Sequence, residues 1–111
     1  TPATRAIDNL YGHPGYGYKY VNTNTNLTLA DFYVLVDANL GNVTVFLPTT
    51  GLANGVMFHI KAWIPSVYPV TIDGGSISIE TFGTTVALSG YKAYILIYDT
   101  TLGRWMVSVN G

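Results

Sequence analysis

Alternation of apolar with other side chains, at the two-residue period of a β-strand, is the feature that most restricts how this chain can fold. It is clearest in residues 56–64, where Phe58 and Ile60 fall on one face of an extended chain and His59 and Lys61 on the other. No stretch of about 11 residues or more repeats apolar positions at the spacing of an amphipathic helix. Strands, and not helices, are therefore predicted throughout.

Reading this alternation along the chain predicts about nine short strands, separated by Gly, Asn, Asp and Pro. Their spacing of roughly 8–12 residues is typical of a sandwich or a barrel. We therefore predict an all-β fold, a small antiparallel β-sandwich or barrel over residues 16–111, preceded by a linker over residues 1–15. The predicted strands cover residues 17–22, 32–36, 43–47, 56–64, 68–72, 77–80, 84–88, 91–98 and 104–109, with a shorter extended piece at 27–29.

Several of these strands have one aliphatic face and one mixed face that carries aromatic and polar side chains. The aliphatic face is predicted to form the core, which for the strand 91–98 assigns Ala93, Ile95 and Ile97 to the interior. The mixed face is either a subunit interface or a ligand-binding surface. The mixed faces carry Tyr33, Leu35, Met57, His59, Lys61, Trp63, Lys92, Tyr94, Leu96 and Tyr98.

The chain is rich in apolar residues and poor in charge. Of its 111 residues, 49% are hydrophobic and 10% are charged, against about 25% charged in an average soluble domain. A domain of this size buries only ~60–70% of its unfolded surface. Its longest continuous apolar run, residues 93–98, is much shorter than the ~18 residues of a membrane span. We therefore expect no membrane insertion, and we predict that other copies of the chain cover the surplus apolar surface in a homo-oligomer.

The charge distribution argues against a nucleic-acid partner. The formal net charge is −1, and the five basic residues are scattered along the chain, so they form no basic stripe. The absence of cysteine excludes disulfides and cysteine metal sites. The sequence begins with Thr-Pro and shows no recognisable signal peptide, so we expect a fragment or a processed product.

Residues suited to catalysis are few. His13 and His59 are the only histidines, and the six acidic residues fall mostly at predicted strand ends and turns, where aspartate commonly caps the backbone. No pair of carboxylates has a spacing that fixes both on one face, and no serine lies in a nucleophile elbow. The segment 12–15, Gly-His-Pro-Gly, is no metal motif. We predict a non-enzymatic protein with no catalytic residue, no metal ligand and no cofactor.

A cluster of tyrosines stands at the start of the predicted domain. Residues 11–15, which include His13-Pro14-Gly15, are predicted to form a turn or linker. Three tyrosines occupy alternate positions from residue 16 to residue 20, so their rings lie on one face of the first strand. We predict that this face packs against a neighbouring subunit. The predicted subunit-interface residues are Tyr16, Tyr18, Tyr20, Met57 and His59.

Six short segments occur in an order that is similar to that of a known group of proteins. They are Val34–Asp37, Val43–Pro48, Gly55 with His59–Lys61, Val70–Gly74, Ile95–Asp99 and Gly103–Trp105. Together, over about residues 17–109, these segments resemble a β-domain that is common in the fibre, spike and appendage proteins of tailed bacteriophages. The chain departs from that pattern in a longer hairpin at 99–103 and in an aromatic, proline-bearing insert at 63–69, where many members have polar residues.

The resemblance implies a small antiparallel β-sandwich or barrel that is usually a homotrimer. It implies a location within or at the end of a virion fibre, on the extracellular face of the virion. The implied partners are other copies of the chain, an upstream fibre shaft or another virion protein, and host cell-surface polysaccharide. The insert at 63–69 then becomes a candidate for binding specificity.

The aromatic residues favour carbohydrate binding as one function. Aromatic rings stack on the C–H faces of sugars, while amide and charged groups form hydrogen bonds to the hydroxyls. The alternative is that the rings fill a trimer interface, where Tyr and Trp are also enriched, in a purely structural head-fibre, decoration or trimerisation module without a ligand. A polysaccharide-degrading module is a third alternative, although such enzymes usually have a longer β-helical body. The predicted ligand-binding residues are Trp63, Tyr68, Tyr94, Tyr98 and Tyr33, with Asn39 beside them.

Overall fold

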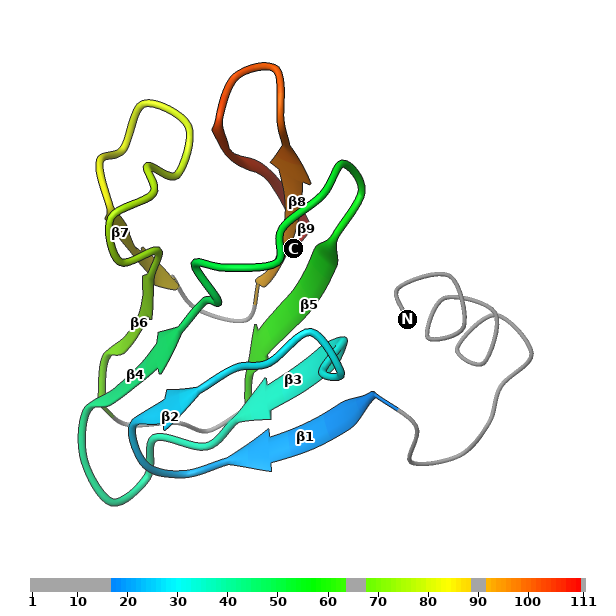
Figure 1. Cartoon of the computed structure of the whole chain (residues 1–111). Coiled ribbons are helices and arrows are strands. Elements are labelled where there is room, and N and C mark those ends of the chain that lie inside the picture. Colours follow the sequence, from blue (N-terminus) through cyan, green and yellow to red (C-terminus); the bar gives the residue numbers. More distant parts are fainter. Residues whose placement is uncertain (1–16, 64–67, 89–91, 111) are drawn as a thin grey trace.

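The first six strands alternate between two stacked β-sheets, so that no two consecutive strands among these six pair with each other (Figure 1). The computed structural model describes residues 17–63, 68–88 and 92–110. The five-stranded sheet consists, in order, of β1 (Tyr18–Val21), β3 (Tyr33–Val36), β5 (Met57–Ala62), β8 (Ala93–Asp99) and β9 (Arg104–Asn110). The four-stranded sheet consists, in order, of β2 (Thr25–Asn26), β4 (Val43–Phe46), β6 (Val70–Asp73) and β7 (Thr85–Leu88).

This alternation makes the early strands parallel. β1, β3 and β5 run parallel in one sheet, and β2, β4 and β6 run parallel in the other. A parallel pair needs a crossover connection, and here the strand in the facing sheet provides it. The chain thus forms three stacked coils, each made of one strand from each sheet: β1 with β2, β3 with β4, and β5 with β6. Strands β7, β8 and β9 then add antiparallel pairs.

The prediction of an all-β, sandwich-like fold is confirmed, and the described residues contain nine strands and no helix. The prediction that the strands are all antiparallel is wrong, because both sheets are mixed, and the sheets do not close into a barrel. Alternation fixes which side chains of a strand face the core. It does not fix which strand lies next to it, because strands in two facing sheets carry the same pattern.

The core lies between the two sheets. Its centre is formed from the five-stranded sheet by Val34, Phe58 and Ile60, and from the four-stranded sheet by Val45 and Ile72, all fully buried. Trp105 of β9 and Ile79, which precedes β7, close one end of it. The aliphatic faces predicted for the strands that became β3 and β5 are therefore the faces that are buried.

The face predicted for the strand 91–98 is inverted from Tyr94 onward, although Ala93, predicted to be interior, is buried. Tyr94 is 8% exposed and Leu96 is fully buried, whereas Ile97 is 38% exposed. The register explains this, because Tyr94 pairs with Ile60 and Leu96 pairs with Phe58. Paired residues share a face of a sheet, so β8 must turn the same side inward as β5 does.

Two predicted extended segments differ from what the structure contains. Residues 77–80 do not form a strand and contribute only an isolated parallel bridge between Ile79 and Trp105. The short extended piece is predicted at 27–29, but the strand found in this region is β2, which ends at Asn26. The Leu27 N–H continues the ladder of β2 by donating to the Phe46 carbonyl at 2.8 Å.

The two edges of the five-stranded sheet differ. The outer edge of β9 is covered by residues 78–80. The Trp105 N–H donates to the Ser78 carbonyl at 3.0 Å, the Glu80 N–H donates to the Trp105 carbonyl at 2.8 Å, and the Val107 N–H donates to Glu80 Oε1 at 2.7 Å. Glu80 adopts a φ of 44° to do this, the one positive φ among described non-glycine residues. β1, at the other edge, has a described neighbour on one side only.

Candidate functional site

The outer face of the five-stranded sheet carries large apolar and aromatic side chains from all five strands. Tyr18, Tyr20 and Ile97 are exposed on it, and most of the remaining side chains are half-buried. Lys61 is the charged residue at its centre, and the paired Asp99 and Arg104 lie on the same side of β8 and β9 at the hairpin end. We call this surface the aromatic face. It consists of Tyr18, Tyr20, Tyr33, Leu35, Met57, His59, Lys61, Ile95, Ile97, Met106 and Ser108.

A row of rings crosses the aromatic face at right angles to the strands. Tyr18, Tyr33, His59 and Ile95 are successive partners in the register of β1, β3, β5 and β8. The rings of Tyr18 and Tyr33 stack with their centroids 6.2 Å apart, and those of Tyr33 and His59 lie 4.7 Å apart. The parallel coils create this row, because they place equivalent positions of successive coils side by side.

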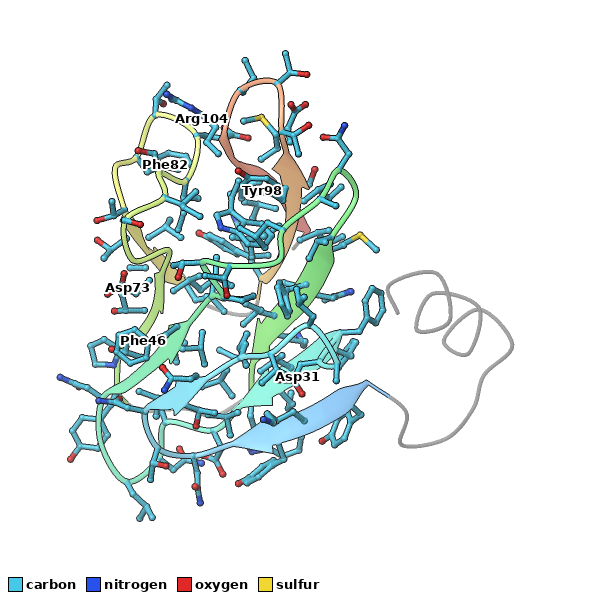
Figure 2. The ribbon with its side chains drawn as sticks, in the orientation of Figure 1. Asp31, Phe46, Asp73, Phe82, Tyr98 and Arg104 are labelled. Atoms are coloured by element: carbon cyan, nitrogen blue, oxygen red, sulfur yellow. The ribbon has the colours of Figure 1, made fainter. Side chains whose placement is uncertain are left out.

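The outer face of the four-stranded sheet is different in composition. Its rows pair Thr44 with Thr71, and Phe46 with Asp73 and Thr85 (Figure 2). Threonine and aspartate suit a solvated sheet face, whereas tyrosine, isoleucine and methionine favour a buried one. The two faces of the sandwich are thus suited to different surroundings.

His59 sits in the middle of the aromatic face, where burial and, to a smaller extent, the positive charge of Lys61 lower its pKa. A histidine whose folded-state pKa is lowered resists a proton that the unfolded chain accepts. The neutral ring at pH 7 therefore matches its apolar surroundings.

We expect the free energy of unfolding to fall as the pH is lowered through about 6.5, the ordinary range of histidine, and to stop falling once the folded-state pKa is passed. Urea titrations over this range should show a steeper loss of stability for the wild-type chain than for His59→Gln. His13 is present in both proteins, so its contribution cancels. Identical pH profiles would contradict the prediction.

The turns that follow β1, β3 and β5 stack along one edge of the sandwich, at the lower end of Figure 1. Hydrogen bonds join successive turns. The Trp63 N–H donates to the Val36 carbonyl at 2.6 Å, the Tyr68 N–H donates to the Ala38 carbonyl at 3.0 Å, and the Thr44 N–H donates to Asn24 Oδ1 at 2.8 Å. We call this surface the turn edge.

Two of the predicted ligand-binding residues lie at the turn edge. Trp63 is 48% exposed and Tyr68 is 47% exposed, so both rings present free surface. Residues 64–67 of the insert, between these rings, lie outside the described residues. The prediction for Trp63 and Tyr68 thus meets the first requirement of a stacking site, an accessible ring.

The other predicted ligand-binding residues are elsewhere. Tyr94 and Tyr98 turn inward, and the Tyr98 ring meets that of Trp105 edge-on at 5.4 Å (Figure 2). Tyr33 belongs to the aromatic face. The five residues therefore do not form one site, because the inverted face of β8 directs two of them into the core.

The predicted interface residues are grouped more closely. Tyr18, Tyr20, Met57 and His59 all lie on the aromatic face. Tyr16 lies outside the described residues. The Tyr20 hydroxyl also donates a hydrogen bond to Asp37, and this bond, burial and the carboxylate charge all raise the pKa of Tyr20.

The aspartates serve the backbone. Asp37 accepts from the Asn39 N–H, Asp73 accepts from the Gly75 N–H, and Asp99 accepts from the Thr101 and Leu102 N–H groups. In each case the hydrogen bond from the residue two positions later closes an Asx-type turn.

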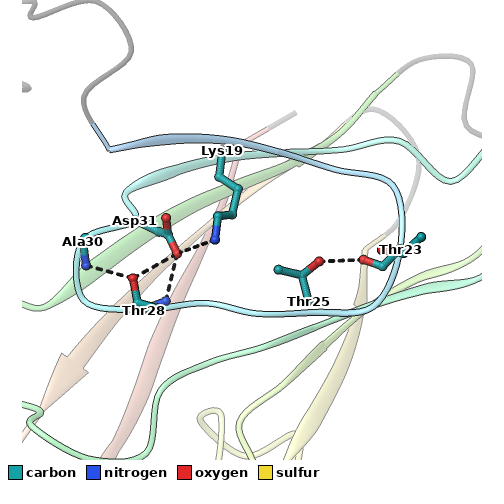
Figure 3. Close-up of polar contacts among 6 residues, drawn as sticks. All are labelled: Lys19, Thr23, Thr25, Thr28, Ala30 and Asp31. Atoms are coloured by element: carbon teal, nitrogen blue, oxygen red, sulfur yellow. Dashed lines mark hydrogen bonds and ion pairs between the residues drawn. The ribbon is translucent and has the colours of Figure 1, made fainter.

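Asp31 is buried and holds the connection that leads into β3 (Figure 3). It accepts from the Thr28 N–H at 2.8 Å and lies 3.4 Å from the Lys19 ammonium. Within the described ranges, no three His, Asp or Glu side chains come together as metal ligands.

Hollows occur at both ends of the strands. One, of about 380 Å³, is lined by Glu80, Thr81, Leu102, Arg104 and Met106. Its two charged side chains bind the protein itself, because Arg104 Nη1 donates to the Glu80 carbonyl at 2.9 Å and the Glu80 carboxylate accepts from Val107. The other, of about 440 Å³, lies at the turn edge between the first two turns. The sequence alone does not reveal this second hollow, because its residues come from separate coils.

Known proteins are similar to this chain in fold alone. No protein-family model matches the chain, and no curated protein matches it. A solved structure described as "Structure of a chaperone-substrate complex" is similar to it, with a TM-score of 0.53 and 11% identity. The match covers 88% of this chain and 15% of that one, so the similarity concerns a small part of a much longer protein. Among the described residues, no helix is long and apolar enough to cross a membrane.

Proposed function

We propose that the chain is a non-enzymatic domain of a virion fibre or appendage, which assembles into a homotrimer and attaches to host-surface glycan. The observation that carries the proposal is the aromatic face, a row of rings and aliphatic side chains that spans all five strands of one sheet. The trimeric state and the virion setting are expectations from the resemblance to bacteriophage fibre domains. The aromatic face supplies what such an assembly needs.

The composition of the aromatic face supports association with copies of the chain. Tyrosine, methionine and isoleucine are typical of the core of a protein interface, and charged residues are depleted there. Lys61 is the one charged residue among the eleven of the aromatic face, and the oppositely charged Asp99 and Arg104 pair with each other beyond it at the hairpin end. The threonine-rich outer face of the four-stranded sheet would then remain in solvent.

Substitution of Ile97 tests the assembly. Ile97 is 38% exposed on the aromatic face, and Ile97→Lys would place an unpaired charge in a desolvated interface. We expect the wild-type chain to be trimeric in size-exclusion chromatography with light scattering, and the variant to associate at least about tenfold more weakly.

Thr85→Lys is the matched control, because it adds the same charge to an exposed strand position of the other sheet. It should leave the mass unchanged, and circular dichroism should show that both variants keep the fold. A wild-type chain that stays monomeric at micromolar concentration would contradict the proposed assembly.

The attachment part of the proposal rests on the exposed rings at the turn edge. We expect Trp63→Ala and Tyr68→Ala each to weaken binding to host cells or purified host glycan by about tenfold, the usual effect of removing an aromatic anchor. Phe82→Ala is the control. Phe82 is 58% exposed and lies at the other end of the strands, so its removal should change binding little. Unchanged binding in both turn-edge variants would remove these rings from the site.

A purely structural module is the second candidate, and one observation favours it. The row from Tyr18 to Ile95 is explained by assembly alone, without a ligand. A thermally stable trimer that binds neither host cells nor host glycan would decide for this candidate.

A further inference from the structure

The hollow at the turn edge has walls from two successive coils. The turn between β1 and β2 forms one wall and the turn between β3 and β4 forms the other, and the hollow measures about 440 Å³. That volume lies within the range of small-molecule sites. The lining residues are Asn22, Thr23, Asn24, Leu40, Gly41 and Asn42.

Hydrogen bonds fix both walls. In the first wall, Asn24 Oδ1 accepts from the Thr44 N–H at 2.8 Å, and the Thr23 carbonyl accepts from Thr25 Oγ1 at 2.8 Å (Figure 3). The bond to Thr44 orients the Asn24 amide and leaves its nitrogen as a donor. In the second wall, Asp37 accepts from the Asn39 N–H at 3.1 Å. The Asn24 amide is thus held in place before any ligand arrives, which lowers the entropic cost of binding.

The lining residues carry no charge. They include three side-chain amides and one hydroxyl, and no acidic or basic residue. An amide presents a donor and an acceptor side by side, which matches neighbouring sugar hydroxyls. A phosphate or carboxylate would need a cation or a set of backbone donors, and a hard metal ion would need carboxylates. Leu40, 87% exposed at the rim, offers an apolar surface for the C–H face of a sugar ring.

We infer that this hollow binds one residue of an uncharged saccharide. The inference deepens the attachment part of the proposed function by giving the ligand a class and a site, and it is independent of the trimer. Trp63 and Tyr68 lie on the same turn edge, in the turn that follows the third strand of the five-stranded sheet. A longer glycan would run from the hollow across the second turn toward these rings.

Gly41 allows a large side chain to be added at the wall of the hollow without disturbing the backbone. A Cβ built at Gly41 meets no atom within 4 Å, and its φ lies outside the left-handed region. Gly41→Leu would therefore add a large side chain at the wall of the hollow, with no steric obstacle to its Cβ. Thr50→Leu is the matched control, because it adds the same side chain to an exposed loop at the opposite end of the strands.

The experiment uses the full chain labelled with ¹⁵N and a panel of trisaccharides. The uncharged members are built from glucose, galactose, mannose or N-acetylglucosamine, and the charged members are sialylated or phosphorylated. With at least one uncharged member we expect shifts in the side-chain amide signals of Asn22, Asn24 and Asn42. Gly41→Leu should weaken that binding at least about tenfold, and Thr50→Leu should not change it.

The outcomes separate this inference from the proposed function. Host-cell binding that persists in Gly41→Leu, with no asparagine shift in the wild-type chain, overturns the inference and leaves the attachment role to Trp63 and Tyr68. Asparagine shifts with charged saccharides alone overturn the ligand class. Saccharide binding by a chain that proves monomeric supports the inference while the proposed assembly fails.

Discussion

Replacement of Trp105 by alanine is expected to destabilise the domain by about 3–5 kcal/mol, the usual cost of deleting a fully buried tryptophan. The side chain is completely buried, and its ring lies 5.7 Å from that of Phe58 and 5.4 Å from that of Tyr98. Its backbone also bonds to the segment that covers β9, through Ser78 and Glu80. Since a domain of this kind has roughly 5–15 kcal/mol of total stability, the variant would lose a large share of it.

Trp105→Phe separates the packing of the aromatic ring from any contribution of the indole N–H. The indole Nε1 is buried and has no hydrogen-bond partner among the described residues, so its removal breaks no hydrogen bond. Phenylalanine keeps much of the ring volume, and we expect it to cost less than half as much as alanine. Urea unfolding followed by far-UV circular dichroism measures both. An alanine variant that loses under about 1 kcal/mol would show that the core closes without the ring.

The second large effect is expected at Gly74. A Cβ at this position would lie 2.3 Å from the Ile77 carbonyl oxygen, which is backbone and cannot turn aside. The Gly74 N–H donates to Thr84 and its carbonyl accepts from Ile77, so the residue is held on both sides. We expect Gly74→Ala to cost at least about 1–3 kcal/mol, as for other overpacked positions.

Gly41→Ala is the matched control for this prediction. A Cβ there meets no atom within 4 Å, so the substitution should be neutral or should stabilise the chain by about 0.4–1 kcal/mol through the unfolded state. Thermal and urea unfolding of the two variants, side by side, measure the difference. Equal stability of both variants would mean that the turn after β6 moves to accommodate a methyl group.

The sequence predicts the faces of the strands better than their neighbours. The alternation in residues 32–36 and 56–64 identifies the buried side chains of β3 and β5 correctly. Pairing depends on which coil lies next to which, and a four-residue strand contains no signal for that. The failure at residues 91–98 shows the consequence, because both faces of this strand are apolar and only its pairing with β5 directs Tyr94 inward.

The site was predictable only in part for the same reason. Trp63 and Tyr68 stand out in the sequence as aromatic residues beside a proline-bearing insert, and both are exposed in the structure. The hollow at the turn edge brings residues 22–24 together with 40–42, two polar turns that look ordinary when read separately. Stacking of the coils makes them one surface, and stacking follows from the parallel pairing that the alternation does not reveal.

The cover over β9 limits how copies of the chain can join through their backbones. Exposed strand edges allow sheets to add end to end, and unlimited addition produces fibrils. In the five-stranded sheet, residues 78–80 and the Glu80 carboxylate occupy the edge at β9, while β1 has a described neighbour on one side only. Two copies that met through β1 would present a covered β9 at each end, so growth by this sheet would stop at a pair.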